Sequence, residues 1–263
     1  MSGEITAALW AESLKVRRSL VPWVTVGAIV LAGFVGAFFM FVLQDVDRAK
    51  ALGLLGAKAQ LTGGSADWPG YFSLTAQMAS VGGLLIFGII LIWLFGREFS
   101  DRTAQDLLAL PTARTSVVLA KVVLALAWSL LLLTLLLLLT LAFGTLLGLP
   151  GWSTANVLRG ASTVLLTGGL TAGLAMTYGL AASVGRGFLP AVGAMFLTLL
   201  AAQVVAAIGY GAWFPWSVPS LIAGAAGPDQ AQPGLFGIAS VVLVTVASVA
   251  ATVAWWERAD HAA

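Results

Sequence analysis

Six long apolar segments, separated by short polar breaks, make up most of this chain and limit what it can fold into. None of them contains Asp, Glu, Lys or Arg. A helix needs roughly 20 apolar residues to cross the ~30 Å hydrocarbon core of a bilayer, and each segment exceeds that length. The segments are Val21–Leu43, Tyr71–Phe95, Val122–Leu147, Ala161–Val184, Phe188–Tyr210 and Leu235–Trp256. The sequence therefore predicts a polytopic membrane protein.

The composition excludes a water-soluble globule. Charged residues are 9% of the 263 residues and hydrophobic residues are 60%, whereas a soluble domain carries about 25% charged residues. Backbone in lipid has to satisfy its own hydrogen bonds, which leaves helices or closed barrels. Leu- and Ala-rich runs without strict alternation favour helices. We expect an all-α fold in which residues 1–263 form a single transmembrane domain.

The usual signatures of catalysis and cofactor binding are missing from the sequence. There is no cysteine, and the one histidine, His261, is in the polar C-terminal tail. Thiolate chemistry and a histidine metal cluster are therefore excluded within one chain. No Gly-rich phosphate loop ending in Gly-Lys-Ser/Thr, no Gly-x-Ser-x-Gly and no HExxH occurs. We expect no catalytic residue, no metal and no cofactor in this chain, and hence no enzyme activity of its own.

Basic residues gather on one side of the predicted topology. Six crossings place both termini on the same side of the membrane, and nine of the thirteen Lys and Arg residues are on that side. They are Lys15, Arg17, Arg18, Arg97, Arg102, Arg114, Lys121, Arg186 and Arg258. The positive-inside rule then places both termini in the cytoplasm of a bacterial plasma membrane.

Two polar segments precede the second crossing. Residues 1–20 combine apolar and basic side chains, which favours a helix lying in the headgroup layer over a solvated lead-in. Residues 44–70 end in a run of glycine, aspartate and proline. This pattern is typical of turns, so we expect a solvated external loop rather than a binding element.

Residues 97–116 are the most structured polar segment. Ser100 is a good N-cap, Asp101 follows in the first turn where the helix dipole favours an anion, and Pro111 ends the helix. The pattern predicts a short cytoplasmic helix held between two crossings. From the residues alone, docking of a partner and a purely structural connection are equally supported.

Residues 211–234 contain an aromatic and proline-rich run, FPWSVPSLI, within a long uncharged stretch. Pro215 and Pro219 interrupt helix formation. Non-helical backbone at membrane depth survives only where protein covers it or where it faces a water-filled cavity. We predict a re-entrant or interfacial helical element on the external side; an ordinary aromatic-rich loop is the alternative.

These features resemble the ABC-2-type permeases, the membrane subunits of type V ABC transporters, and most of all the bacterial permeases linked to bacitracin, lantibiotic or multidrug export. The segment that carries the resemblance best is GREFSDRTAQDLLALPTARTSVVLAK, residues 96–121. In that family it contains the coupling helix that docks on the ATPase subunit. The resemblance implies that role for Glu98, Phe99, Asp101, Arg102, Asp106 and Leu107. It also implies that FPWSVPSLI forms an external re-entrant gate with Phe214, Pro215, Trp216 and Pro219.

The resemblance implies a permease subunit of an ATP-driven exporter of hydrophobic or amphipathic cargo, such as a peptide antibiotic, drug or lipid. Two copies of a cytoplasmic ABC ATPase, which bind ATP and Mg²⁺, would power it, and a second permease chain, identical or related, would complete the pathway. Two alternatives stay open: an ion-coupled secondary carrier or channel, and a membrane scaffold that transports nothing. An ionisable residue inside the membrane would favour the carrier.

Overall fold

Six long helices dominate the structure, a computed structural model that describes residues 2–45, 65–101, 113–225 and 232–258. Within those ranges the chain contains helices and turns and no strand. The long helices are α2 (Val21–Leu43), α5 (Trp68–Ser100), α7 (Arg114–Leu146), α8 (Thr154–Val184), α9 (Phe188–Ala207) and α11 (Leu235–Arg258). Each is long and apolar enough to cross a membrane. The predicted all-α fold with six transmembrane helices is therefore confirmed.

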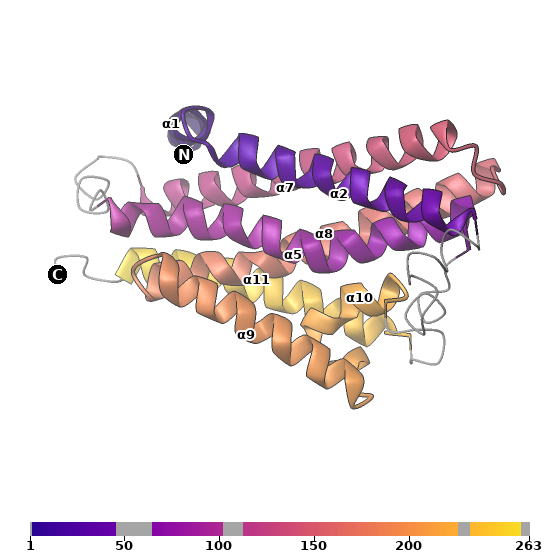
Figure 1. Cartoon of the computed structure of the whole chain (residues 1–263). Coiled ribbons are helices and arrows are strands. Elements are labelled where there is room, and N and C mark those ends of the chain that lie inside the picture. The colour runs from indigo at the N-terminus through magenta and orange to yellow at the C-terminus, as the bar shows by residue number, and fades with distance from the viewer. Residues whose placement is uncertain (1, 46–64, 102–112, 226–231, 259–263) are drawn as a thin grey trace.

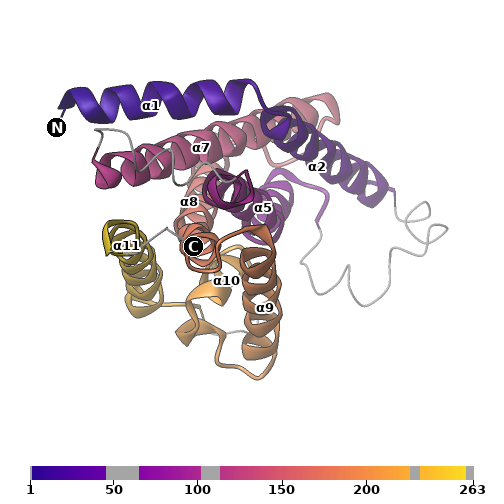
Figure 2. The ribbon, with the colours of Figure 1, turned by 90° about the vertical axis from the view of Figure 1, so that its left-hand side faces the viewer.

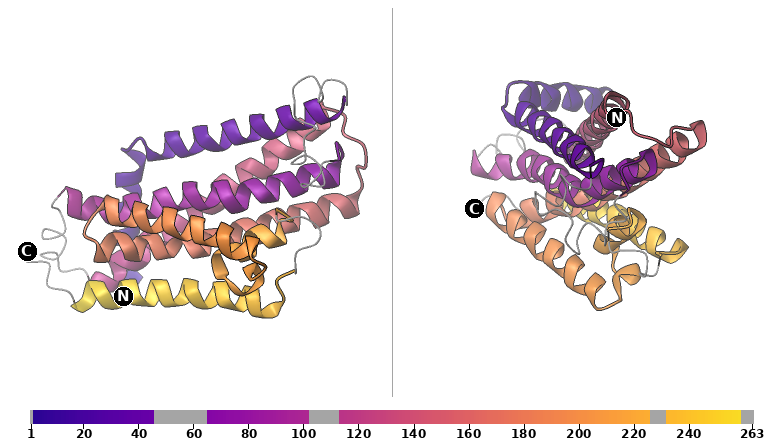
Figure 3. Two further views of the ribbon diagram at one scale, coloured as in Figure 1. Left: turned by 60° about the horizontal axis from the view of Figure 1, so that its bottom comes forward. Right: turned by 45° about the vertical axis from the view of Figure 1, so that its right-hand side comes forward.

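Helices α5 and α8 form the centre of the bundle. In the most apolar windows of these two helices 61% of residues are buried, compared with 17% for α9, so lipid has to cover the outer helices. Figures 1 and 2 show α1 (Ser2–Arg17), α2 and α7 on one side of this central pair, and α9 and α11 on the other. The two further views in Figure 3 show the same division.

The helices end at two opposite faces of the bundle. The end of α11, the start of α2 and the turn between α8 and α9 lie at one end, together with α1, which runs across the bundle (Figures 1 and 2). We call this the terminal end. The short helices η1 (Gly211–Trp213), η2 (Pro215–Ser217) and α10 (Val218–Ile222) lie at the opposite end. An even number of crossings produces this arrangement, and the charge bias predicts that the terminal end is cytoplasmic.

Helices α5 and α8 begin before the predicted apolar segments, and a polar side chain caps the first turn of each. The Asp67 carboxylate accepts a hydrogen bond from the Gly70 N–H at 2.8 Å, which starts α5 at Trp68. Ser153 Oγ accepts from the Asn156 N–H at 3.1 Å and starts α8 at Thr154. Ser100, which we predicted to be the N-cap of a new helix, is instead the last residue of α5. Side-chain capping satisfies backbone donors that have no partner inside the helix.

Glycines on α8 let its neighbours approach closely. A Cβ atom on Gly160 would lie 2.2 Å from Phe72 Cγ and 2.7 Å from Phe72 Cβ, at the rigid base of that side chain. On the same helix, a Cβ on Gly169 would meet no atom within 4 Å. Close approach of helices through small residues is the usual basis of packing inside membranes, where no hydrophobic effect acts between helices.

We expect Gly160→Ala to lower the free energy of unfolding by about 1 to 3 kcal/mol, because overpacking forces Phe72 and the α5 backbone to move. Gly169→Ala is the matched control, since it adds the same methyl group to the same helix in open space. Unfolding by SDS titration in mixed micelles measures both. Equal stability of the two variants would show that α5 and α8 do not pack as described.

Candidate functional site

Four charged side chains from three helices meet at the terminal end of the bundle. We call them the charge cluster: Glu12 and Lys15 of α1, Glu98 of α5 and Lys121 of α7. Glu12 and Glu98 are each 2% exposed and Lys121 is fully buried. Burying a charge is costly unless it is paired and hydrogen-bonded, so these four groups depend on one another.

The geometry occupies all three donors of the Lys121 ammonium and two of those of Lys15. Lys121 Nζ donates to Glu12 Oε2 at 2.8 Å, to Glu98 Oε1 at 2.8 Å and to the Leu94 carbonyl at 2.9 Å. An ammonium has three donors, so all of them are used. Lys15 Nζ donates to Glu12 Oε1 and to Glu98 Oε1, each at 2.8 Å. Two cations and two anions cancel, and the cluster fastens α1 across the ends of α5 and α7.

Lys15 stays charged within this cluster. Partial burial acts to lower its pKa, but the charge of Glu12 and the hydrogen bonds to Glu12 and Glu98 outweigh burial, so that the pKa of Lys15 is raised. A raised pKa means that the stability contributed by this lysine is fully present below its ordinary value of 10.5 and is lost only as the pH rises further. The lysine is therefore cationic throughout the neutral range.

An aromatic cluster ties the end of α11 to the same place. The Phe99 ring lies 5.8 Å from the rings of both Trp255 and Trp256, and Trp256 Nε1 donates to Ser183 Oγ at 3.0 Å. Arg114, the first residue of α7, donates to the carbonyls of Trp256 and Glu257 at 3.2 and 3.3 Å and so satisfies the C-terminal end of α11. Residues 102–112 thus connect two helix ends that are both anchored to other helices.

The structure separates the residues that the resemblance assigned to ATPase docking. Glu98 is buried in the charge cluster, and Phe99, which is partly exposed, packs against Trp255 and Trp256. The docking role of both residues stays a prediction. Asp101 is at the surface, where its carboxylate accepts from Arg97 Nε at 2.8 Å. Arg102, Asp106 and Leu107 lie outside the described residues.

Sequence reasoning missed Glu12, Lys15 and Lys121 as partners of Glu98. Two signals were available. Glu12 and Lys15 have the spacing that places side chains on one face of a helix, and Lys121 directly precedes a long apolar segment. In the part of the chain that the structure describes, no group of three or more His, Cys, Asp or Glu side chains could hold a metal ion.

The residues predicted to form an external gate lie together at the opposite end. Phe214 and Trp216 have ring centroids 5.4 Å apart, and Pro219 is buried in α10. Ser217 Oγ donates to the Ala202 carbonyl of α9 at 2.8 Å, and Ser73 Oγ of α5 donates to the Ala223 carbonyl at 3.2 Å. The short helices therefore form a cap that is fastened to α5 and α9.

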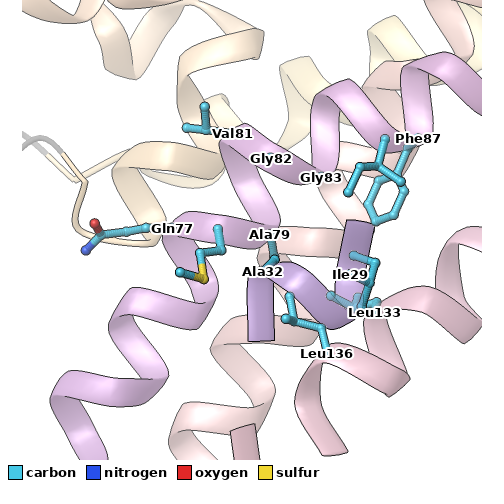
Figure 4. Close-up of a pocket in the computed structure, with 12 residues that line it drawn as sticks. Ile29, Ala32, Gln77, Ala79, Val81, Gly82, Gly83, Phe87, Leu133 and Leu136 are labelled. Atoms are coloured by element: carbon cyan, nitrogen blue, oxygen red, sulfur yellow. The ribbon is translucent and has the colours of Figure 1, made fainter. Parts of the chain in front are cut away.

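An apolar cavity of about 330 Å³ lies between α2, α5 and α7. Figure 4 shows Ile29 and Ala32 of α2 facing Gly82 and Gly83 of α5, with Leu133 and Leu136 of α7 beside them. Gln77 is the one polar side chain in its lining. A space with such walls suits a hydrocarbon group rather than an ion.

We expect Lys121→Met to lower the free energy of unfolding by about 3 to 5 kcal/mol, because Glu12 and Glu98 would keep their charges and lose a buried partner. Asp101→Asn breaks only the exposed pair with Arg97 and should cost less than about 1 kcal/mol. SDS titration in mixed micelles measures both.

Adding Glu98→Gln to Lys121→Met should restore part of the loss, because it removes the uncompensated carboxylate. If Lys121→Met is no more harmful than Asp101→Asn, the charge cluster does not hold these helices together.

Comparison with known proteins gives one family and one relative. The profile of the ABC-2 family transporter proteins matches residues 8–204. The bacitracin transport permease protein BCRB of Bacillus licheniformis is 29% identical over 179 residues, which cover 68% of this chain and 85% of that protein. No solved structure matches the chain.

The matched region runs from α1 through α9 and includes all four residues of the charge cluster. Six apolar helices, a helix across their terminal end and a profile match over most of the length agree with one another. The chain belongs to the ABC-2 family of transporter proteins.

Proposed function

We propose that this chain exports an amphipathic cargo as the permease of a complex in which two cytoplasmic ATPase subunits hydrolyse ATP and a second permease completes the pathway. The observation that carries the proposal is the bracing around residues 102–112. The preceding helix end is held by the charge cluster, and the following one is bonded to α11. A force applied at this connection would move α5, α7, α1 and α11 together rather than one loop alone.

The distribution of buried charge supports an external energy source. Among the described residues, the buried charged side chains are Glu12, Glu98 and Lys121, all in the cluster at the terminal end. The other buried side chains with polar groups in the described spans are serines, threonines, tyrosines and tryptophans, which carry no formal charge. Ion-coupled carriers commonly use an ionisable group within the membrane, so the ATP-driven function is favoured over the carrier.

In this proposal α5 and α7 act as levers. They run from the terminal end to the apolar cavity, which both of them line with α2. Closure of the ATPase subunits on ATP would push on residues 102–112 and change the spacing of these helices where the cavity lies. The cap made by η1, η2 and α10 closes the other end of the bundle, and it would have to open for release.

A peptide antibiotic is the proposed class of cargo. The relative from Bacillus licheniformis is named as a bacitracin transport permease, and the apolar cavity would accept the hydrocarbon part of such a molecule. Export from the membrane or the cytoplasm would then confer resistance.

The first test is purification of the tagged chain from its native membranes in mild detergent. We expect a soluble subunit with a Gly-Lys-Ser/Thr phosphate loop to copurify, identified by mass spectrometry, and the eluate to hydrolyse ATP. Replacing residues 102–110 by a Gly/Ser linker of equal length should remove that subunit and leave the permease monodisperse. A permease that is pure and folded but brings no ATPase would contradict the proposal.

The second test is growth in the presence of bacitracin. Cells that produce the chain together with its ATPase should tolerate more bacitracin than cells that produce either subunit alone, because transport needs both. An ATPase variant without its phosphate-loop lysine is the control. Copurification without any gain in resistance would keep the permease assignment and exclude this cargo.

A further inference from the structure

A second pocket, of about 500 Å³, opens at the terminal end between α1, α5 and the start of α9. Its charged lining consists of Lys15, Arg18, Arg97 and Asp101, and its aromatic lining of Trp93 and Phe188. We call it the basic pocket. It does not overlap the apolar cavity and was not among the sites that the sequence suggested.

Two guanidinium groups in the basic pocket have donors to spare. Arg97 uses Nε for Asp101 and lies with its guanidinium carbon 5.3 Å from the centre of the Trp93 ring. Its two Nη groups donate no hydrogen bond within the part of the chain that the structure describes. Arg18 is exposed and makes no side-chain hydrogen bond or ion pair with any described residue. Lys15, in contrast, is already shared by two carboxylates.

The basic pocket lies at the depth of a membrane surface. Trp10 and Trp23, which flank it in the sequence of α1 and α2, are 67% and 76% exposed. Exposed tryptophans on membrane proteins prefer the boundary between headgroups and hydrocarbon. Arg18 and Arg97 are therefore placed where lipid phosphates are found.

One face of α5 connects the basic pocket to the apolar cavity. Arg97, Trp93, Ile89, Ile86 and Gly82 recur at helical spacing, and each of them is at least partly exposed. Ile86 and Gly82 line the apolar cavity. At 1.5 Å per residue, Arg97 and Ile86 are ~16 Å apart along the helix, which matches one leaflet, half of a ~30 Å hydrocarbon core.

We propose that an anionic phospholipid binds along this face, with its phosphate at Arg18 and Arg97 and one acyl chain running over Ile89 into the apolar cavity. A guanidinium fork fits phosphate oxygens with paired hydrogen bonds, and basic pockets at the membrane surface select anionic headgroups. A choline headgroup would bring its cation against the cationic lining. The proposal does not depend on the cargo or on the ATPase.

The test is native mass spectrometry of the full chain in mild detergent, titrated with dioleoyl phosphatidylglycerol and, separately, dioleoyl phosphatidylcholine. We expect one phosphatidylglycerol molecule to bind at a saturable site and phosphatidylcholine to bind more weakly. The double variant Arg18→Gln and Arg97→Gln should weaken phosphatidylglycerol binding roughly tenfold or more. Arg159→Gln, which removes a cation at the opposite end of the bundle, should leave it unchanged.

Four results would overturn the headgroup assignment. Equal binding of the two lipids would show that the pocket does not distinguish an anionic headgroup from a zwitterionic one. If the Arg159 variant loses as much phosphatidylglycerol affinity as the double variant, the lipid is attracted to cationic side chains in general and not to this pocket. Inorganic phosphate that displaces the lipid at equal concentration would show a site for a soluble phosphate. If the double variant binds lipid normally but loses the ATPase on purification, the basic pocket is a protein-docking surface.

The acyl chain is tested with Gly82→Leu. A Cβ at Gly82 meets no atom within 4 Å, so the variant should fold and fill the apolar cavity. The wild-type chain should prefer dioleoyl to dihexanoyl phosphatidylglycerol, and Gly82→Leu should remove that preference while it keeps binding of the dihexanoyl lipid. An unchanged preference would show that the acyl chain does not enter the cavity.

Discussion

Three charged side chains, those of Glu12, Glu98 and Lys121, are buried in this protein because each is paired with an opposite charge, and the partly exposed Lys15 completes the set. The ammonium of Lys121 has all three donors occupied, two of them by Glu12 and Glu98. Such a network adds little net stability compared with an apolar core of the same shape, but removing one partner is costly. The network therefore fixes the position of α1. When α1 lies across the ends of α5 and α7 all four charges are paired, and other positions would leave buried charges without partners.

That placement determines how the terminal end can respond to a partner. The charge cluster and the Phe99 aromatic cluster lie on successive residues of α5, so the same turn of helix is bonded to α1, α7 and α11. The two helix ends that residues 102–112 join are therefore both held to the rest of the bundle.

The six crossings could be predicted from the sequence because a bilayer imposes length and apolarity on each segment independently. The bounds of α2 follow directly from its apolar run, whereas α5 and α8 run further because Asp67 and Ser153 cap them. The charge cluster could not be predicted in this way. The docking role of Glu98 came from the family resemblance, and its place in the charge cluster depends on the tertiary approach of residues 12 and 121, which the sequence pattern does not show. Trp128 makes another contact that depends on the tertiary fold: its indole N–H donates to Thr25 Oγ1 of α2 at 3.1 Å.

The exposed face of α5 connects the basic pocket with the apolar cavity. This helix is central and mostly buried, yet it leaves one stripe open between α2 and α9, from Arg97 down to Gly82. At Gly82 an added Cβ would meet no atom within 4 Å, so no protein side chain packs against α5 at that position. A lipid molecule fills such a stripe without fixing α2 to α5, since lipid chains exchange and adapt their shape. A helix that has to move relative to its neighbours during transport is better sealed by lipid than by interlocked side chains.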